Sequence, residues 1–91
     1  MLHVVCYDIS DDNTRNRLSG ELLNFGTRIQ ESVFECLLDD KLYARMLGQI
    51  GKITLKDTDR VRIYRLCSRC VDVVKIYGPG EVTVDQDWYL V

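Results

Sequence analysis

The feature that most constrains the fold of this chain is its N-terminal run from Leu2 to Ile9, "LHVVCYDI". Except for His3 and Asp8, its residues are apolar, so both faces of a pleated strand would be hydrophobic. A strand of this kind lies inside a sheet and is covered on both sides. The sequence therefore predicts a central β-strand over residues 2–9.

Two helices are predicted from periodicity and end signals. Over residues 11–25 apolar residues recur at helical spacing, acids occupy the first turn, and Gly26 stands where a glycine often ends a helix. Further along, Asp39 and Asp40 offer an N-cap, apolar residues follow at helical spacing, and Gly51 closes the pattern. This second pattern is the clearest helix signal in the chain.

The remaining patterned segments read as β-strands, because they are rich in β-branched and aromatic residues. They are residues 27–38, 60–67, 71–77 and 81–91. A bend or bulge near Gln30 to Ser32 is expected to divide the first. Ser-Arg-Cys joins the two middle segments, and a Gly-Pro-Gly turn ends the third. The segment 81–91 is too long and too apolar to remain an unpaired edge strand, so it needs another strand to pair with.

This order of elements predicts an α+β ferredoxin-like sandwich, βαββαβ plus a C-terminal strand, with two helices on one face of an antiparallel sheet. The 91 residues suffice for one domain with a modest core, yet 46% are hydrophobic. We therefore expect some apolar surface to be buried between chains, as a homodimer through the other sheet face. In this prediction residues 1–78 form the ferredoxin-like domain, and the 79–91 strand segment pairs with the partner protomer.

Charge and targeting signals narrow the function classes. The net charge is −2, which argues against the strongly basic surface of a typical nucleic-acid-binding domain. Arginines nevertheless outnumber lysines, which suits planar contacts to phosphate and equally suits a solvated surface. The N-terminus lacks the pattern of a signal peptide, and no apolar run is long enough to span a membrane. We expect a soluble, cytoplasmic protein with no membrane partner.

Asp8 is the anomalous residue of the first strand. A carboxylate at the end of a central strand is costly to bury as an ion unless something compensates its charge. A divalent cation such as Mg²⁺ could do so, and two copies of Asp8 meeting across a two-fold interface would require such a cation or a shared proton. The alternative is that the local acids only turn the chain and cap the helix. That explains Asp11 and Asp12 better than Asp8, which precedes Ile9.

Three arginines follow this strand. Arg15 and Arg17 fall in the first two turns of the predicted helix, where the helix dipole does not favour positive charge, and Arg28 begins the next strand. Cations in such places indicate a bound anion, and phosphate is the natural candidate. Salt bridges to acids of the same helix are an equally good explanation from spacing alone.

Two other features carry chemistry with alternatives left open. Cys67 and Cys70, in "CSRC", have the spacing of half a zinc site or of a redox pair, and ordinary thiols are the simpler interpretation. The single histidine, His3, could act as a general base, although a histidine satisfied by its strand neighbours is the commoner case.

The stretch "YDISDDNTRNRL", followed by "GTRIQESVFE", resembles the small CRISPR-associated endonuclease family, the adaptation protein that partners the CRISPR integrase in spacer acquisition. The resemblance extends over nearly the whole chain. It implies a ferredoxin-like homodimer whose metal site lies between the protomers. Asp8 matches the metal-binding aspartate of the family, and its loss is expected to abolish nuclease activity.

The same resemblance implies further site residues. Tyr7, Arg15, Arg17 and Arg28 would join Asp8 in catalysis, and the three arginines with Phe34 would bind nucleic acid. The activity implied is Mg²⁺- or Mn²⁺-dependent hydrolysis of phosphodiesters in single-stranded RNA or double-stranded DNA. Two other hypotheses remain at this point. One is a non-catalytic DNA-binding scaffold of the acquisition complex, and the other is a small-ligand or regulatory domain with the same fold.

Overall fold

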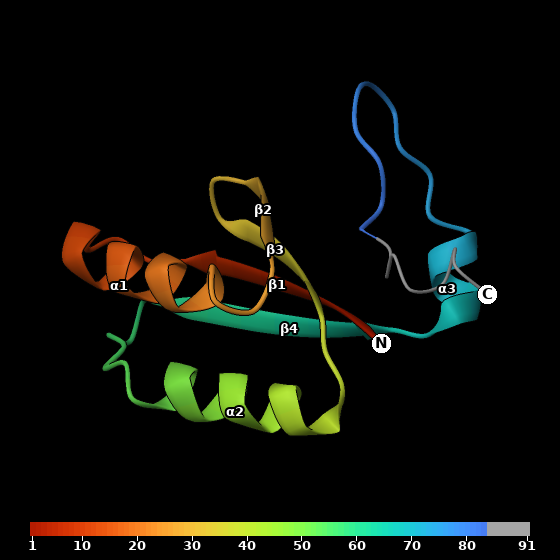
Figure 1. The fold of residues 1–91 in the computed structure, drawn as a ribbon. Coiled ribbons are helices and arrows are strands. Elements are labelled where there is room, and N and C mark those ends of the chain that lie inside the picture. The colour runs from red at the N-terminus through yellow and green to blue at the C-terminus, as the bar shows by residue number, and fades with distance from the viewer. Residues whose placement is uncertain (84–91) are drawn as a thin grey trace.

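The computed structural model describes residues 1–83 (Figure 1). Its elements are β1 (Leu2–Asp8), α1 (Asp12–Leu22), β2 (Thr27–Gln30), β3 (Val33–Leu37), α2 (Asp40–Gly51), β4 (Arg60–Leu66) and α3 (Ser68–Asp72). Most of the predicted final strand, residues 84–91, lies outside the described residues. Among the helices that are described, none is long and apolar enough to cross a membrane.

The four strands form one antiparallel sheet in the order β2-β3-β1-β4. Val5 at the middle of β1 faces Phe34 on β3 and Ile63 on β4, so β1 has a neighbour on each side. The prediction of a central first strand is confirmed. The predicted bend near Gln30 is confirmed too, since β2 and β3 form a hairpin whose register shifts between Arg28 and Gln30.

Side-chain caps explain where the two main helices begin. The carboxylate of Asp11 accepts hydrogen bonds from the backbone N–H of Thr14 at 2.9 Å and from its hydroxyl at 3.0 Å. These bonds hold the pKa of Asp11 below its usual value. Asp39 accepts in the same way from the backbone N–H of Leu42, at 2.8 Å. Both caps satisfy backbone donors that the first turn leaves free, and both were predicted from the sequence.

Gly26 has a different role from the predicted one. Helix α1 ends at Leu22, three residues before the predicted end, and Gly26 lies beyond it. A Cβ at this position would lie 2.8 Å from the Cα of Cys36, and still closer to the carbonyl oxygen of Glu35. Gly26 is therefore required by the close approach of the chain to β3, and not by the helix end.

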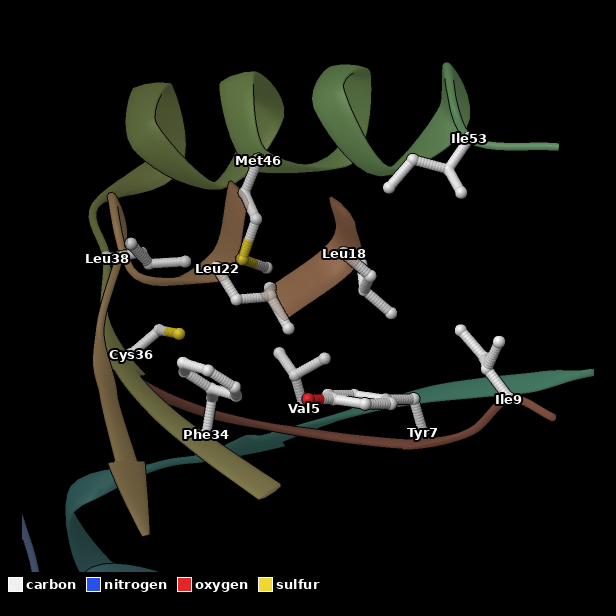
Figure 2. Close-up of a cluster of buried hydrophobic side chains, with 10 residues drawn as sticks. All are labelled: Val5, Tyr7, Ile9, Leu18, Leu22, Phe34, Cys36, Leu38, Met46 and Ile53. Atoms are coloured by element: carbon white, nitrogen blue, oxygen red, sulfur yellow. The ribbon is translucent and has the colours of Figure 1, made fainter. Parts of the chain in front are cut away.

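The core lies between one face of the sheet and the two longer helices (Figure 2). Alternate side chains of β1 and β3 enter it, because successive strand residues point to opposite faces. The fully buried or nearly buried members are Val5, Tyr7, Ile9, Leu18, Leu22, Phe34, Cys36, Leu38, Met46 and Ile53. Since α1 and α2 both contribute to this single cluster, they cover the same face. The ferredoxin-like fold class is confirmed.

The opposite face of the sheet carries no helix among the described elements and is less apolar than predicted. Half-buried Val4 stands beside Glu35 on β3 and Tyr64 on β4, and arginines follow along β4. Thr83 lies against this face, and its backbone N–H and hydroxyl donate to the Glu35 carboxylate at 3.0 and 2.6 Å. Homodimerisation through this face stays a prediction.

The predicted strand at residues 71–77 is wrong. The chain forms the short helix α3 at Ser68–Asp72, and residues 73–77 belong to no helix or strand. β-Branched residues fit a strand only when they pair with a neighbouring strand, and this segment pairs with none, although the outer edge of β4 is unpaired within residues 1–83. Gly78 and Gly80 have φ angles of +95° and +125°, which favour glycine, but the regular structure of residues 1–83 has already ended at Asp72, so these residues end no strand.

Candidate functional site

A polar hollow of about 440 Å³ opens where β1 ends. Its wall comes from the end of β1, the first half of α1 and the β2–β3 hairpin. The residues that line it are Tyr7, Asp8, Ile9, Arg15, Asn16, Ser19, Arg28, Glu31 and Ser32. We call this feature the strand-end hollow. It brings together segments that lie more than 20 residues apart in the sequence.

Four of the six predicted site residues line the strand-end hollow: Tyr7, Asp8, Arg15 and Arg28. Arg17 and Phe34 do not. Arg17 is two residues beyond Arg15 on α1, which turns it roughly 200° around the helix axis, and it is exposed to solvent. The predicted roles of all six residues remain predictions, but the structure places the four within reach of one ligand.

Asp8 is the last residue of β1, opposite Arg60 on β4. Its side chain is exposed, whereas Ile9 directly after it enters the core with 3% of its surface accessible. The expected burial cost of the Asp8 charge therefore does not arise within one protomer, because the strand ends there and the carboxylate points to solvent. An exposed carboxylate in a polar hollow is instead free to meet a cation or a second chain.

Tyr7 links two walls of the strand-end hollow, the end of β1 and the β2–β3 hairpin, through hydrogen bonds. Its ring is buried, and its hydroxyl donates to the carbonyl oxygen of Glu31 at 3.0 Å. Its backbone N–H donates to the carbonyl oxygen of Ser32 at 3.1 Å. Both bonds join the end of β1 to the turn of the β2–β3 hairpin. Tyr7 therefore positions the hairpin relative to Asp8.

Arg15 is anchored on both sides. Its Nη1 donates to the carbonyl oxygen of Ile9 at 3.0 Å, and its Nη2 forms an ion pair with Asp12 one turn back on α1. The intrahelical salt bridge left open by the sequence is thus present. The side chain remains 40% exposed, so part of the guanidinium still faces the hollow.

Arg28 has fewer partners. Its guanidinium carbon lies 5.3 Å from the centre of the Phe34 ring, in a cation–π contact. No ion pair to Arg28 is found within residues 1–83. Phe34 itself is fully buried, so a base cannot stack on its ring while the core stays closed. In this structure Phe34 acts as the platform that orients the positive charge of Arg28.

Sequence reasoning did not select Asn16, Ser19, Glu31 or Ser32, which also line the hollow. On α1, Ser19 lies four residues after Arg15 and shares its side of the helix, whereas Asn16 is turned about 100° from Arg15. The Ser19 hydroxyl donates to the carbonyl oxygen of Asn16 at 3.1 Å. The i, i+4 spacing from Arg15 was the signal that could have found Ser19, whereas no spacing pattern marked Asn16.

His3 lies outside this site. It is buried, with 1% of its surface exposed, and its ring stacks on Tyr43 with the ring centres 4.6 Å apart. Burial lowers its pKa from the ordinary value. The structure thus places His3 in the core and away from the hollow, but neither of its ring nitrogens is hydrogen-bonded within residues 1–83, so the expectation that strand neighbours satisfy it is not met.

The donor set of the hollow suits a weakly held cation. Residues 1–83 contain no cluster of three or more acidic, histidine or cysteine side chains that could enclose a metal. Mg²⁺ does not need one, since it is often held by one or two carboxylates, water and substrate phosphates. Asp8 provides an exposed carboxylate, and Glu31 lies in the same hollow. One protomer therefore fits such an ion if other ligands come from a substrate or a second chain.

Comparisons with known proteins agree on one family. Residues 1–74 match the family model described as CRISPR associated protein Cas2. The protein of Chloroflexus aurantiacus named CRISPR-associated endoribonuclease Cas2 1 is 37% identical over 94 residues, which cover 100% of each chain. The protein of Methanospirillum hungatei named CRISPR-associated endoribonuclease Cas2 2 is 41% identical over 83 residues, covering 91% of this chain and 90% of its own.

Solved structures support the fold. The hypothetical protein TT1823 from Thermus thermophilus superposes with a TM-score of 0.75 and 35% identity, covering 89% of this chain and 94% of its own. Streptococcus pyogenes Cas2 has a TM-score of 0.73 at 24% identity, covering 86% and 100%. A chain of a solved partial Cas6-RT-Cas1–Cas2 complex has a TM-score of 0.64 at 25% identity, covering 82% and 88%.

Proposed function

Because the chain belongs to the Cas2 family of CRISPR-associated proteins, we propose that it is a homodimeric, metal-dependent endonuclease that acts with the integrase Cas1 in spacer acquisition. RNA is the first substrate to test, since the similar proteins of C. aurantiacus and M. hungatei are named endoribonucleases. Double-stranded DNA is the second. The likeness to a chain from a Cas1–Cas2 complex supports the partnership.

The observation that carries this proposal is the strand-end hollow. It gathers an exposed carboxylate, Asp8, and two guanidinium groups, Arg15 and Arg28, around a polar space. A phosphodiester requires positive charge to bind and to stabilise the additional negative charge of its transition state. The hollow contains these groups, although the whole chain has a net negative charge.

In the proposed reaction Arg28 binds the scissile phosphate. The Phe34 ring beneath it limits its freedom, so its charge is in place before negative charge develops on the phosphoryl oxygens. Arg15 has two of its nitrogens engaged by Ile9 and Asp12. It therefore adds a second, fixed positive charge and keeps α1 against the end of β1.

Asp8 would hold the divalent cation, Mg²⁺ or Mn²⁺. When bound, such an ion supplies Lewis-acid stabilisation of a phosphoryl oxygen and makes a coordinated water more acidic. A single carboxylate holds it weakly, so the proposal includes a second copy of the chain that contributes its own Asp8. The exposure of Asp8 at the end of β1 is compatible with this arrangement.

A DNA-binding scaffold without catalysis is the second candidate function. The observation that favours it is the same single exposed Asp8 per described protomer, with no cluster of metal ligands in residues 1–83. In that case the arginines bind DNA phosphates within the complex with Cas1, and any cleavage of nucleic acid is incidental to spacer acquisition. A folded Asp8→Asn variant that still supports spacer acquisition would support the scaffold, whereas loss of acquisition would support the enzyme.

The proposed nuclease is tested by a cleavage assay on single-stranded RNA and double-stranded DNA with Mg²⁺, Mn²⁺ or EDTA. We expect Asp8→Asn to lower the rate by about a hundredfold or more. Asp57→Asn is the matched control, since Asp57 is an exposed acid that does not line the hollow. Cleavage that continues in EDTA, or is equal in both variants after contaminating nucleases are removed, would refute the proposal.

A further inference from the structure

Two of the four cysteines lie far from the strand-end hollow. Cys67 directly precedes α3 and Cys70 lies in its first turn. The chain enters α3 from the end of β4, where Leu66 pairs with Leu2, whereas Asp8 pairs with Arg60 at the other end of the sheet. Figure 1 shows this separation. The pair is therefore independent of the proposed nuclease site.

The geometry of this pair differs from that of ordinary surface thiols. The two Sγ atoms are 3.6 Å apart, within hydrogen-bonding distance, and both side chains are exposed. Residues three apart in a helical turn lie close enough for a disulfide once their side chains rotate, because the bond needs Cα atoms within roughly 4.4–6.8 Å. No backbone rearrangement of the sheet is required.

The two thiols are also chemically unequal. The backbone N–H of Cys70, its thiol and the backbone N–H of Arg69 together lower the pKa of Cys67. The neighbouring Cys67 sulfur in turn raises the pKa of Cys70. A pair with one readily formed thiolate and one adjacent thiol has the two parts of a disulfide-exchange site, an attacking and a resolving sulfur.

The other two cysteines provide an internal contrast. Cys36 is fully buried in the core, and burial, followed by the charge of Glu35, raises its pKa to about 11. Cys6 is half-buried in the middle of the sheet. A buried thiol with a raised pKa is inert toward disulfides. Reaction is therefore expected at α3 before it occurs in the sheet.

We propose that Cys67 and Cys70 form a dithiol site that reacts with low-molecular-weight disulfides and closes to an intramolecular disulfide. Cys67 as thiolate attacks one sulfur of the reagent, forming a mixed disulfide and releasing one thiolate, which takes up a proton. Cys70 then loses its proton to solvent and attacks the Cys67 sulfur. That step forms the Cys67–Cys70 bond and releases the second thiolate. Two protein thiols are oxidised, and one disulfide is reduced to two thiols.

The site occupies a position from which it acts on the C-terminal part of the chain. α3 links β4 to the segment that reaches Thr83, whose backbone N–H and hydroxyl bind Glu35 on the open sheet face. A covalent bond between Cys67 and Cys70 fixes the first turn of α3, from which this segment departs. Oxidation is expected to be local to this turn and to leave the core cluster unchanged.

The test uses the full chain in buffers of reduced and oxidised glutathione. Free thiols are alkylated, and the protein is digested and analysed by mass spectrometry. We expect a peptide that contains both Cys67 and Cys70 joined by a disulfide, which a reductant reverses, while Cys36 remains a thiol. Disulfides that join two chains, or a pair alkylated to the same extent as Cys6 at every glutathione ratio, would overturn the proposal.

Two single variants separate the roles of the sulfurs. Cys70→Ser should accumulate a stable mixed disulfide on Cys67, because the resolving thiol is gone. Cys67→Ser should form mixed disulfide at Cys70 more slowly near neutral pH than Cys70→Ser does at Cys67, because the backbone N–H groups of Arg69 and Cys70 favour the thiolate of Cys67. Equal rates in the two variants would contradict the assigned order of attack. Both positions are exposed, so folding is not expected to fail.

Discussion

His3 is the buried titratable residue whose protonation is expected to affect the stability of the fold. Its ring is buried against Tyr43, and neither ring nitrogen has a hydrogen-bond partner within residues 1–83. Burial lowers its pKa, so the folded protein resists a proton that the unfolded chain accepts near pH 6.5. The stabilisation is complete above that pH. It is lost as the pH falls toward the lower pKa of the folded state.

We predict that replacing His3 by Phe removes part of this pH dependence. Between the two pKa values the free energy of unfolding of the wild type should fall by up to about 1.4 kcal/mol per pH unit because of His3 alone. His3→Phe keeps a ring for stacking on Tyr43 and cannot be protonated. Urea unfolding of both proteins at several pH values between about 8 and 5 measures the difference. Parallel curves over that range would show that His3 is not the group responsible.

Arg28 and Arg17 should differ in their contribution to RNA binding. Arg28 lines the strand-end hollow, whereas Arg17 is exposed on another side of α1. We expect Arg28→Ala to weaken binding of single-stranded RNA by about tenfold or more, since a charge-assisted bond to phosphate contributes about 1.5–3 kcal/mol. Arg17→Ala is the matched control, with an expected change of less than about threefold.

Fluorescence anisotropy at several salt concentrations makes this comparison. Loss of one phosphate contact should also reduce the slope of log affinity against log salt, by about 1 for Arg28→Ala. Circular dichroism checks that both variants fold. An equal loss for the two arginines would mean that the hollow is not where RNA binds.

At the same residue scale, the sequence predicted some site residues for reasons that the structure supports. Asp8 stood out because a carboxylate is unusual at the end of an apolar strand, and it does line the hollow. Its exposure was not predictable, since it depends on where β1 stops relative to the hairpin. Asn16 and Ser19 were missed because single polar residues in a helix form no chemical motif, and only the spacing of Ser19 from Arg15 pointed to the hollow.

At the scale of secondary-structure elements, Gly26 provides the sharpest test of packing. We predict that Gly26→Ala lowers the free energy of unfolding by about 1–3 kcal/mol or more, because its Cβ would collide with the backbone of β3. Gly20 is the matched control, since a Cβ added there in α1 meets nothing within 4 Å. Gly20→Ala should raise stability by about 0.5–1 kcal/mol, as expected for a helix interior.

Chemical denaturation of the two glycine variants decides this point. The predicted result is a change of opposite sign in the two proteins, with the slope against denaturant unchanged. If Gly26→Ala were as stable as Gly20→Ala, the conclusion that Gly26 lies too close to β3 for a side chain would be wrong.

Elements with strong local signals could be predicted from the sequence, and elements that depend on a partner could not. The caps at Asp11 and Asp39 are local, so the starts of α1 and α2 were predicted correctly. The apolar pattern of β1 predicted its central place. The strand expected at residues 71–77 had only composition to support it. That segment pairs with no strand, and the chain there forms α3 and an irregular segment.

At the scale of the whole molecule, the proposed metal site depends on a second copy of the chain. The sheet face without helices carries Val4, Cys6 and other half-buried apolar residues, and Tyr64 there is 49% exposed. At the end of β1, Asp8 offers one exposed carboxylate. Two protomers related by a two-fold axis that brings these ends together would supply two carboxylates to one cation, which a single protomer does not.

Titration of Mn²⁺ into the protein, with free ion followed by electron paramagnetic resonance, tests whether two copies of Asp8 share one cation. We predict one bound Mn²⁺ for every two chains, loss of that binding in Asp8→Asn, and its retention in the control Asp57→Asn. One ion per single chain, or binding of equal strength in Asp8→Asn, would contradict this prediction.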